Sequence, residues 1–256
     1  MLPAPLAVPL LVLGGLAAGS FLTVCIRRLP EGGSVITPRS HCPTCGHIVR
    51  WRDNVPVISY LVLGGRCRDC GARISAMYPA VEIATPLLFL LQYALAGFGP
   101  PLASRLVFTS MLVVLFVTDL RHRLLPDVIT IRGAVVGLVA AIWLPPGWID
   151  ALIGALGGLL LLLAIRELYW RIRGHEGLAY GDAKMLGLVG AFLGWRLMLV
   201  SAVFAFLLGA AVGLALIAAG RAGPRTELPF GSFLAVAAII AMAVGDRVLA
   251  WYLAFY

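Results

Sequence analysis

Long apolar blocks separated by short polar loops dominate this sequence. Eight blocks can be marked, at about residues 2–26, 79–97, 103–118, 128–144, 149–165, 185–195, 197–220 and 229–244. They run past the roughly 10 residues of a membrane barrel strand and lack its alternation of apolar and polar side chains. Because lipid cannot hydrogen-bond to backbone amides, such blocks predict helices that span a membrane. The expected fold is an all-α polytopic membrane protein with about eight transmembrane helices.

The one sizeable polar segment covers residues 27–78 and contains eight Arg against three acidic residues. It divides the chain into a first transmembrane helix at residues 1–26, a loop domain at 27–78 and a transmembrane helical domain at 79–256. If the amino terminus lies outside, 16 of the 20 Lys and Arg fall in inner loops. Positive charge accumulates on the cytoplasmic side of membrane proteins, so the 27–78 loop is predicted to be cytoplasmic.

Composition agrees with a lipid environment. The chain is 61% hydrophobic and 12% charged, whereas soluble domains are roughly a quarter charged. So few charged residues cannot cover a water-facing surface. The net charge of +8 does not indicate a nucleic-acid partner, because the arginines lie between the apolar blocks and report membrane orientation instead.

Four of the five cysteines form two matched pairs, Cys42-Pro-Thr-Cys45-Gly and Cys67-Arg-Asp-Cys70-Gly. Each pair can direct two thiolates at one ion, and four thiolates complete a tetrahedral structural zinc site that has no open catalytic position. The alternatives are two disulfides, which would require an outside loop, or two redox sites, which rarely occur as a matched pair. The sequence predicts a zinc-ribbon-like insertion with one Zn²⁺ bound by Cys42, Cys45, Cys67 and Cys70.

The sixth apolar block, residues 185–195, has 11 residues, or about 16 Å of helix against a hydrocarbon core of about 30 Å. Either the helix begins before Asp182 and draws this carboxylate below the inner surface, or the segment is a short, broken helix. Both alternatives place Asp182 at a depth where a carboxylate is costly, which makes it a candidate functional group.

Asp119 and Asp182 are the acids that the predicted topology places at the inner mouth of the helical bundle. Two carboxylates that meet there would share a proton, so that one activates a water while the other donates to a peptide carbonyl. Gly181 would leave room for a substrate backbone beside Asp182. Taken singly, Asp119 could instead pair with a nearby arginine and Asp182 could cap a helix. Asp127 is interpreted as a helix cap rather than a catalytic group.

Several segments, in order along nearly the whole chain, carry a family resemblance. They are Gly19-Ser-Phe-Leu-Thr-Val24, the two cysteine knuckles, Trp51-Arg-Asp-Asn-Val-Pro56, Ile74-Ser-Ala-Met-Tyr-Pro79-Ala-Val-Glu82, Asp119 with Leu125-Pro-Asp127, Glu176-Gly with Gly181-Asp182, and Pro229-Phe-Gly231. Together they resemble the bacterial prepilin peptidases, the bifunctional leader peptidase and N-methyltransferase family of type IV pilus and type II secretion systems.

The resemblance implies a membrane aspartyl peptidase of the Gly-x-Gly-Asp type, with Asp119 and Asp182 as its catalytic pair and 79–256 as its peptidase domain. It implies prepilin or pseudopilin substrates, cut after a glycine that ends a short basic leader, at the cytoplasmic face of the bacterial inner membrane. It also implies methylation of the new amino terminus by S-adenosylmethionine. Two positions depart from the family pattern: Ala179 replaces the first glycine of Gly-x-Gly-Asp, and Thr23 replaces an asparagine.

Two other functions remain open from the residues themselves. One is an intramembrane aspartyl protease that acts on a different helical substrate. The other is a proton-coupled transporter with a zinc docking loop, which inverted repeats would favour, although the two halves show no convincing similarity. A membrane-anchored zinc scaffold would explain the knuckles but not the two acids.

Overall fold

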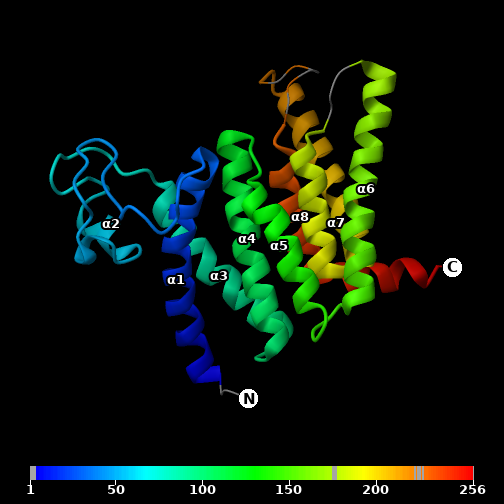
Figure 1. Ribbon diagram of the computed structural model, residues 1–256, viewed down its shortest axis with the longest axis horizontal. Coiled ribbons are helices and arrows are strands. Elements are labelled where there is room, and N and C mark those ends of the chain that lie inside the picture. Colours follow the sequence, from blue (N-terminus) through cyan, green and yellow to red (C-terminus); the bar gives the residue numbers. More distant parts are fainter. Residues whose placement is uncertain (1–3, 175–177, 222, 224–225, 227, 256) are drawn as a thin grey trace. The chain divides into compact units, whose positions relative to one another are not determined.

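The computed structural model describes residues 4–174, 178–221, 223, 226 and 228–255 (Figure 1). Its α-helices are α1 (Ala4–Arg28), α2 (Ile58–Val62), α3 (Met77–Ala96), α4 (Pro100–His122), α5 (Asp127–Ala140), α6 (Trp148–Arg173), α7 (Tyr180–Ala218) and α8 (Phe230–Leu253). Two short 3-10 helices, η1 (Leu29–Glu31) and η2 (Trp51–Asp53), lie between α1 and α2. The described residues form no strands, so the predicted all-α class is confirmed.

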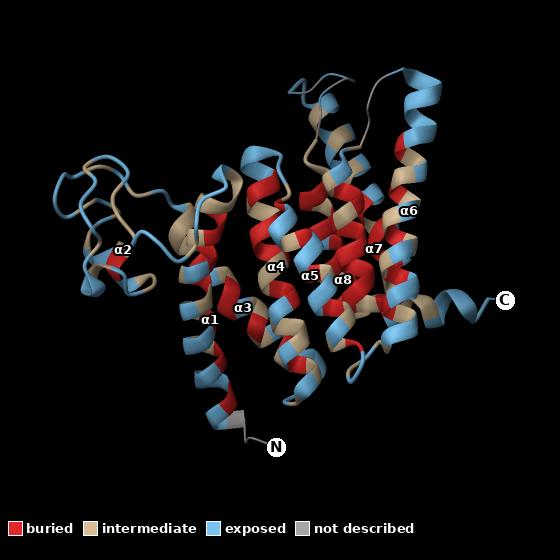
Figure 2. Ribbon diagram, viewed as in Figure 1, coloured by how far each residue is buried: buried red, intermediate tan, exposed pale blue. Residues whose placement is uncertain are grey.

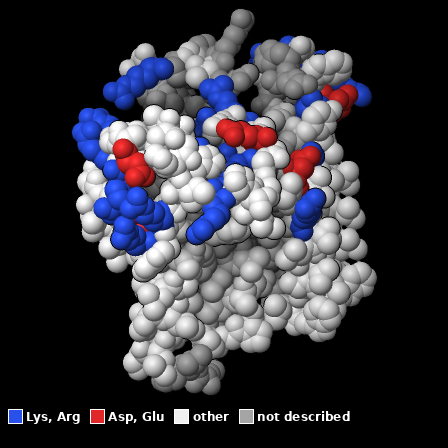
Figure 3. All heavy atoms as spheres, turned by 60° about the vertical axis from the view of Figure 1, so that its left-hand side comes forward, with Lys and Arg blue, Asp and Glu red and all other residues white. Residues whose placement is uncertain are grey.

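Six of these helices are long and apolar enough to cross a membrane: α1, α3, α4, α6, α7 and α8. The protein is therefore a multi-pass membrane protein. All eight predicted blocks fall on helices, but α5 has only 14 residues and the sixth and seventh blocks both lie in α7. The number of eight spans stays a prediction. Figure 3 shows wide areas of the surface that carry no Lys, Arg, Asp or Glu, as expected of helices in lipid.

Helix α7 resolves the two alternatives for the sixth block. It begins at Tyr180, before Asp182, and its helical geometry is interrupted at Gly194, where φ is 75° and ψ is 171°. A side chain rarely adopts this positive φ, so glycine is needed at the break. The first part of α7, residues 180–193, is about 21 Å long. Both alternatives are thus partly right: the helix begins before Asp182, and it is also short and broken.

The chain forms two compact units, divided between Val114 and Leu115 inside α4. In the first unit, α1 packs closely on α3. A Cβ atom on Gly15 would lie 2.5 Å from Pro86 Cα, and one on Gly19 would lie 2.9 Å from Glu82 Cα. These two glycines let the helix backbones approach each other. The predicted division at residues 26 and 78 stays a prediction.

In the second unit, α7 packs against α5, α6 and α8 (Figure 1). Residues 185–191 are all buried, and buried residues are concentrated along α7 and α8 in Figure 2. At the contact with α6, a Cβ atom on Gly154 would lie 2.6 Å from the Gly190 carbonyl oxygen. Glycines on both helices therefore bring the two backbones into direct contact. This close packing holds the first part of α7, which carries Asp182.

Candidate functional site

Asp119 lies in the last turn of α4 and is only 5% exposed. Its carboxylate oxygen Oδ2 accepts hydrogen bonds from the backbone N–H of Ser232, at 2.6 Å, and from the Ser232 hydroxyl, at 3.0 Å. The same hydroxyl also lies 3.1 Å from the carbonyl oxygen of Phe116. Ser232 is in the first turn of α8, where backbone N–H groups are free to bind an acceptor. The amino end of α8 thereby holds the Asp119 side chain in place.

Asp182 lies in the first turn of α7 and is 6% exposed. Its Oδ2 atom accepts a hydrogen bond from the backbone N–H of Ala179, at 3.0 Å. The carboxylate thus reaches back to the residue that precedes the helix, as in one half of a capping box. The predicted capping role is present in the structure, and it orients the side chain without using its second oxygen.

The structure brings Asp119 and Asp182 close enough to interact electrostatically. Leu125, in the loop after α4, lies beside Gly181, the residue before Asp182, and beside Gly231, the residue before Ser232: a Cβ atom would approach its side chain to 3.2 Å from Gly181 and 3.0 Å from Gly231. The Cβ position on Gly231 is also 3.1 Å from Asp119 Cγ. The hydrogen bonds from Ser232 and Ala179 go to the Oδ2 atoms of the two carboxylates.

Three features of this cluster bear on the expectations drawn from sequence. The space beside Gly181 is filled by the Leu125 side chain, so a substrate backbone could approach only if this side chain moved. Asp119 is held by Ser232, while Arg123 acts on its charge from nearby. Ser232 was missed because a serine after the Pro229-Phe-Gly231 segment carries no signal of the acid 113 positions earlier that it binds.

The interpretation of Asp127 as a helix cap is wrong. Asp127 is the first residue of α5, and its side chain makes no capping hydrogen bond. Its two carboxylate oxygens instead accept hydrogen bonds from Lys184 Nζ, at 2.7 and 2.8 Å. Because Pro126 occupies the N-cap position, Asp127 is the first helical residue and does not lie where a side chain caps a helix. The ion pair links the first turns of α5 and α7.

Ala179, which replaces a family glycine, fits its position without strain. Its backbone is extended, with φ of −82° and ψ of 156°, a conformation open to any residue. Thr23, the other departure, is buried in α1 and donates a hydrogen bond to the Ser20 carbonyl. The backbone N–H of Ala179 binds Asp182. The Glu176-Gly part of the family pattern lies outside the described residues.

The second candidate site is the four-cysteine cluster in the 27–78 loop. The Sγ atoms of Cys42, Cys45, Cys67 and Cys70 all lie within 4.8 Å of one another, and all four cysteines are free thiols. Each knuckle is closed by one antiparallel bridge, His41 with Ile48 and Arg66 with Arg73, rather than by extended strands. The cluster could hold a metal ion, and no disulfide joins these four cysteines.

The acid–base chemistry of the cluster also suits a cation. Backbone N–H groups of Cys45 and Thr44 donate to the Cys42 sulfur and lower its pKa to about 6. At Cys70 the Ala72 N–H favours the thiolate, but desolvation and the hydrogen bonds shared with the other three thiols raise its pKa to about 12. Several thiolates this close repel one another, and a divalent cation removes that repulsion.

Comparison with known proteins places both sites in one family. Residues 13–96 match the Bacterial Peptidase A24 N-terminal domain, and residues 106–214 match the Type IV leader peptidase family. Relatives named prepilin leader peptidase/N-methyltransferase occur in Myxococcus xanthus (strain DK1622; 43% identical over 87% of this chain and 67% of that protein) and in Pseudomonas aeruginosa (strain PAO1; 36% identical over 95% of this chain and 92% of that protein). Another, from Aeromonas salmonicida (strain A449), is 37% identical over 95% of this chain and 93% of that protein.

No solved structure matches the chain. On the family match and these relatives, the chain belongs to the type IV prepilin leader peptidase family. The resemblance drawn from its motifs is thereby confirmed.

Proposed function

We propose that this protein is a membrane aspartyl endopeptidase that removes the leader of type IV prepilins or pseudopilins, with Asp119 and Asp182 as its catalytic pair. The observation that carries the proposal is a pair of nearly buried carboxylates, at the ends of two different helices, with the charge of Asp119 acting on Asp182, within residues 106–214 that match the peptidase family. Buried acids in membrane helices are costly and are retained for function.

The chemistry follows from the shared proton. Two buried carboxylates in electrostatic contact do not both ionise, so one is a base and the other an acid. The ionised group takes a proton from a water, whose oxygen attacks the scissile carbonyl carbon, while the protonated group donates to the carbonyl oxygen. When the C–N bond breaks, the proton on the first carboxyl goes to the leaving amine, and a hydroxyl of the tetrahedral intermediate returns a proton to the second carboxylate.

The location and substrate of the reaction belong to the same proposal. The arginine bias of the loops supports an orientation in which the 27–78 loop and the two acids face the cytoplasm. In this orientation a prepilin would be cut at the cytoplasmic face of the bacterial inner membrane. The 79–256 segment is then the peptidase domain, and the 27–78 segment is a separate cytoplasmic lobe.

We also propose that the four cysteines hold one structural Zn²⁺. In a regular tetrahedron with Zn–S bonds of about 2.3 Å, the sulfur atoms are about 3.8 Å apart. The Cys42 and Cys70 sulfurs are 3.8 Å apart, and the remaining separations stay within 4.8 Å. Four thiolates leave no open ligand position, so the ion would stabilise the lobe and take no part in peptide hydrolysis.

A second activity, methylation of the new amino terminus, is proposed on the names of the relatives and on the family resemblance. S-adenosylmethionine would supply the methyl group, and no residue of this chain is assigned to it. Transfer of a labelled methyl group from S-adenosylmethionine to a cleaved pilin tests this activity separately from cleavage.

The peptidase proposal is tested by incubating the purified protein with a prepilin and following leader removal. Asp119→Asn and Asp182→Asn keep the shape of each side chain but remove the titratable group. Each should lower the cleavage rate by about a thousandfold or more, roughly 4 kcal/mol of transition-state stabilisation. The matched control is Asp127→Asn, which changes a nearby acid that is paired with Lys184; cleavage should change only a few-fold.

Near-normal cleavage by either the Asp119 or the Asp182 variant would contradict the catalytic pair. If the wild-type protein, folded and loaded with metal, left prepilins intact but cleaved another membrane helix, the pair would stand and the substrate would be wrong. Proton-driven uptake without any cleavage would favour the transporter instead.

A further inference from the structure

Helix α2 in the 27–78 loop has its apolar face turned outward. Ile58, Leu61 and Val62 occur at positions i, i+3 and i+4, so they share one helix face, and they are 60%, 70% and 74% exposed. The polar residue between them, Ser59, is buried. A helix on a water-facing surface shows the opposite arrangement. This face is therefore built to contact something apolar.

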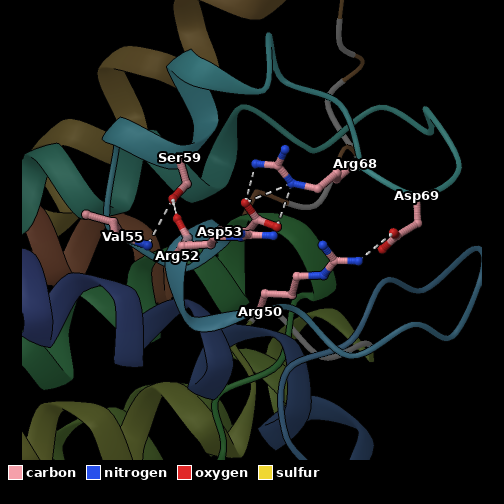
Figure 4. Close-up of polar contacts among 7 residues, drawn as sticks. All are labelled: Arg50, Arg52, Asp53, Val55, Ser59, Arg68 and Asp69. Carbon is pink, nitrogen blue, oxygen red and sulfur yellow. Dashed lines mark hydrogen bonds and ion pairs between the residues drawn. The ribbon is translucent and has the colours of Figure 1, made fainter.

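Trp51, in the neighbouring η2 helix, is 80% exposed. Hydrogen bonds hold η2 and α2 together: the Ser59 hydroxyl donates to the Arg52 carbonyl at 3.0 Å and accepts from the Val55 N–H at 3.0 Å (Figure 4). The Asp53 carboxylate is in turn bound to Arg68 of the second knuckle, at 2.6 to 3.1 Å. Residues 51–62 thus form one braced segment, here called the 51–62 segment.

The 51–62 segment is fixed to a membrane-spanning helix near its end. The Val57 N–H, just before α2, donates to Glu82 Oε2 of α3 at 2.8 Å, and Glu82 is buried. Val57 adopts a φ of 62°, a strained conformation for a β-branched residue that persists only where its surroundings hold it. Helix α3 has 20 residues, which gives about 30 Å, the thickness of the hydrocarbon core. Glu82 comes five residues after its start, at a depth of about 7.5 Å, and amphipathic segments at a membrane interface are buried by about 5–10 Å.

The charge around this segment favours one occupant. The 27–78 loop has eight Arg and three acidic residues, and two of those acids are already bound by Arg68 and Arg50 (Figure 4). An excess of positive charge beside exposed apolar and tryptophan side chains is the composition of a segment that binds an anionic lipid surface. A second copy of the chain would present the same positive charge and be repelled.

We propose that the 51–62 segment inserts Trp51, Ile58, Leu61 and Val62 into the interface of the bilayer that surrounds α1 and α3, and that anionic phospholipid headgroups bind the adjacent arginines. The lobe is then held against the membrane by its own lipid contact as well as by its covalent connections. This role does not depend on the peptidase activity.

The test uses the full-length, metal-loaded protein in nanodiscs whose lipids have brominated acyl chains, which quench tryptophan emission at short range. Subtracting the emission of Trp51→Phe isolates the contribution of Trp51. In discs of phosphatidylcholine with phosphatidylglycerol, this contribution should be blue-shifted, should be mostly quenched by the brominated chains, and should resist aqueous iodide. Quenching should weaken in phosphatidylcholine alone.

Leu61→Asp combined with Val62→Asp should abolish most of the lipid quenching of Trp51. Ile48→Asp is the matched control, because Ile48 is also exposed but belongs to the first knuckle; it should leave the quenching unchanged. Metal content and helical circular dichroism show whether each variant is folded. The comparison of wild type with Trp51→Phe tests the lipid contact without either aspartate substitution.

Trp51 emission that stays open to iodide and insensitive to brominated lipid would overturn the proposal. So would shielding that appears only when prepilin is added, or only in discs that hold two copies, because the face would then bind protein. Equal quenching in neutral and anionic discs would overturn the role of the arginines.

Discussion

The two candidate sites of this protein are built in opposite ways. The four cysteines come from one stretch, residues 42–70, and two tight knuckles bring their sulfurs together. The carboxylate site is assembled from α4, α7, α8 and the loop that carries Leu125, so that its parts are up to 113 residues apart. The proposed metal site depends on short turns and on the ion that it would bind, whereas the carboxylate site depends on how helices pack. Changes to one should therefore leave the other largely intact.

The largest expected effect is on the four-cysteine site, which is built from one short stretch of the chain. Cys42→Ser removes one of four thiolates, so the protein should lose its metal ion and the 27–78 loop should become sensitive to proteases. Structural zinc contributes about 10–16 kcal/mol of apparent binding energy in small zinc domains. Helical circular dichroism should change little, because most helical residues lie outside the loop. Elemental analysis and limited proteolysis measure the two losses.

Cys25→Ser is the matched control for this variant. Cys25 is buried in α1 and is not part of the cysteine cluster, so the variant should keep one metal ion per chain. A protease-resistant loop in metal-free Cys42→Ser would show that the lobe does not need the ion. This result would contradict the difference between the two sites described above.

The next effect tests helix packing. Gly190→Ala would place a methyl group against the backbone carbonyl of Gly154 on α6, where neither backbone can yield. Overpacking of this kind costs about 3 kcal/mol, and more where backbone is involved. The stability of the bundle to denaturant and the cleavage rate should both fall, while the metal content stays at one ion per chain.

Gly157→Ala is the control on the same helix pair, because its added methyl group would meet only Met198 Cε at 3.7 Å, an ordinary contact. Its stability should be unchanged or slightly higher, since alanine favours helix over glycine by up to about 1 kcal/mol. Equal stability of the two variants would mean that the α6–α7 contact tolerates expansion.

A smaller effect is expected at Ser232, which positions Asp119. Ser232→Ala removes the hydroxyl but keeps the backbone N–H that also binds Asp119. Loss of one hydrogen bond to a charged group should cost about 1.5 kcal/mol, or roughly tenfold in kcat, with KM little changed. Ser232→Thr retains a hydroxyl and should recover most of the rate.

Ser201→Ala controls for loss of a buried serine, because the Ser201 hydroxyl only donates to Leu197 within its own helix. It should leave kcat unchanged. If Ser232→Ala raised KM and left kcat intact, Ser232 would contact substrate rather than position the acid.

The smallest effect concerns Asp53, which braces η2 against the second knuckle. The hydrogen bonds and charge of Arg68 lower the pKa of Asp53 below its ordinary value. A lowered pKa means that the pair stabilises the lobe above the unfolded-state pKa, about 3.9, and that this contribution is lost as the pH falls through the lower folded value. From about pH 5 to 8 the Asp53 carboxylate stays ionised, so its contribution should be constant.

Asp53→Asn should accordingly increase proteolysis of the 27–78 loop by a small factor that does not vary across this pH range. Glu31→Gln, at an exposed position in η1, should have no effect. If the increase in proteolysis disappeared at the acid end of this range, the Asp53 carboxyl would titrate there, against the expected direction of its pKa.

The sequence by itself determined the all-α membrane class, and it pointed to the four cysteines that lie together and to the two acids proposed as the catalytic pair. Each of these follows from a local pattern in the sequence. Hydropathy within one block is enough to predict a helix in lipid, and the Cys-x-x-Cys spacing is enough to point two sulfurs at one ion. Burial of an acid in lipid is costly, so an acid at the end of an apolar block is a functional candidate even when its neighbours are unknown.

Only the tertiary structure decided what surrounds those residues. It placed Ser232 on Asp119, paired Asp127 with Lys184 instead of with its own helix, filled the space beside Gly181 with Leu125, and turned the apolar face of α2 outward. These contacts join residues far apart in the chain or depend on which side of a short helix is covered. Helix packing sets them through the shapes of facing side chains, and these shapes leave no periodic signal in the sequence.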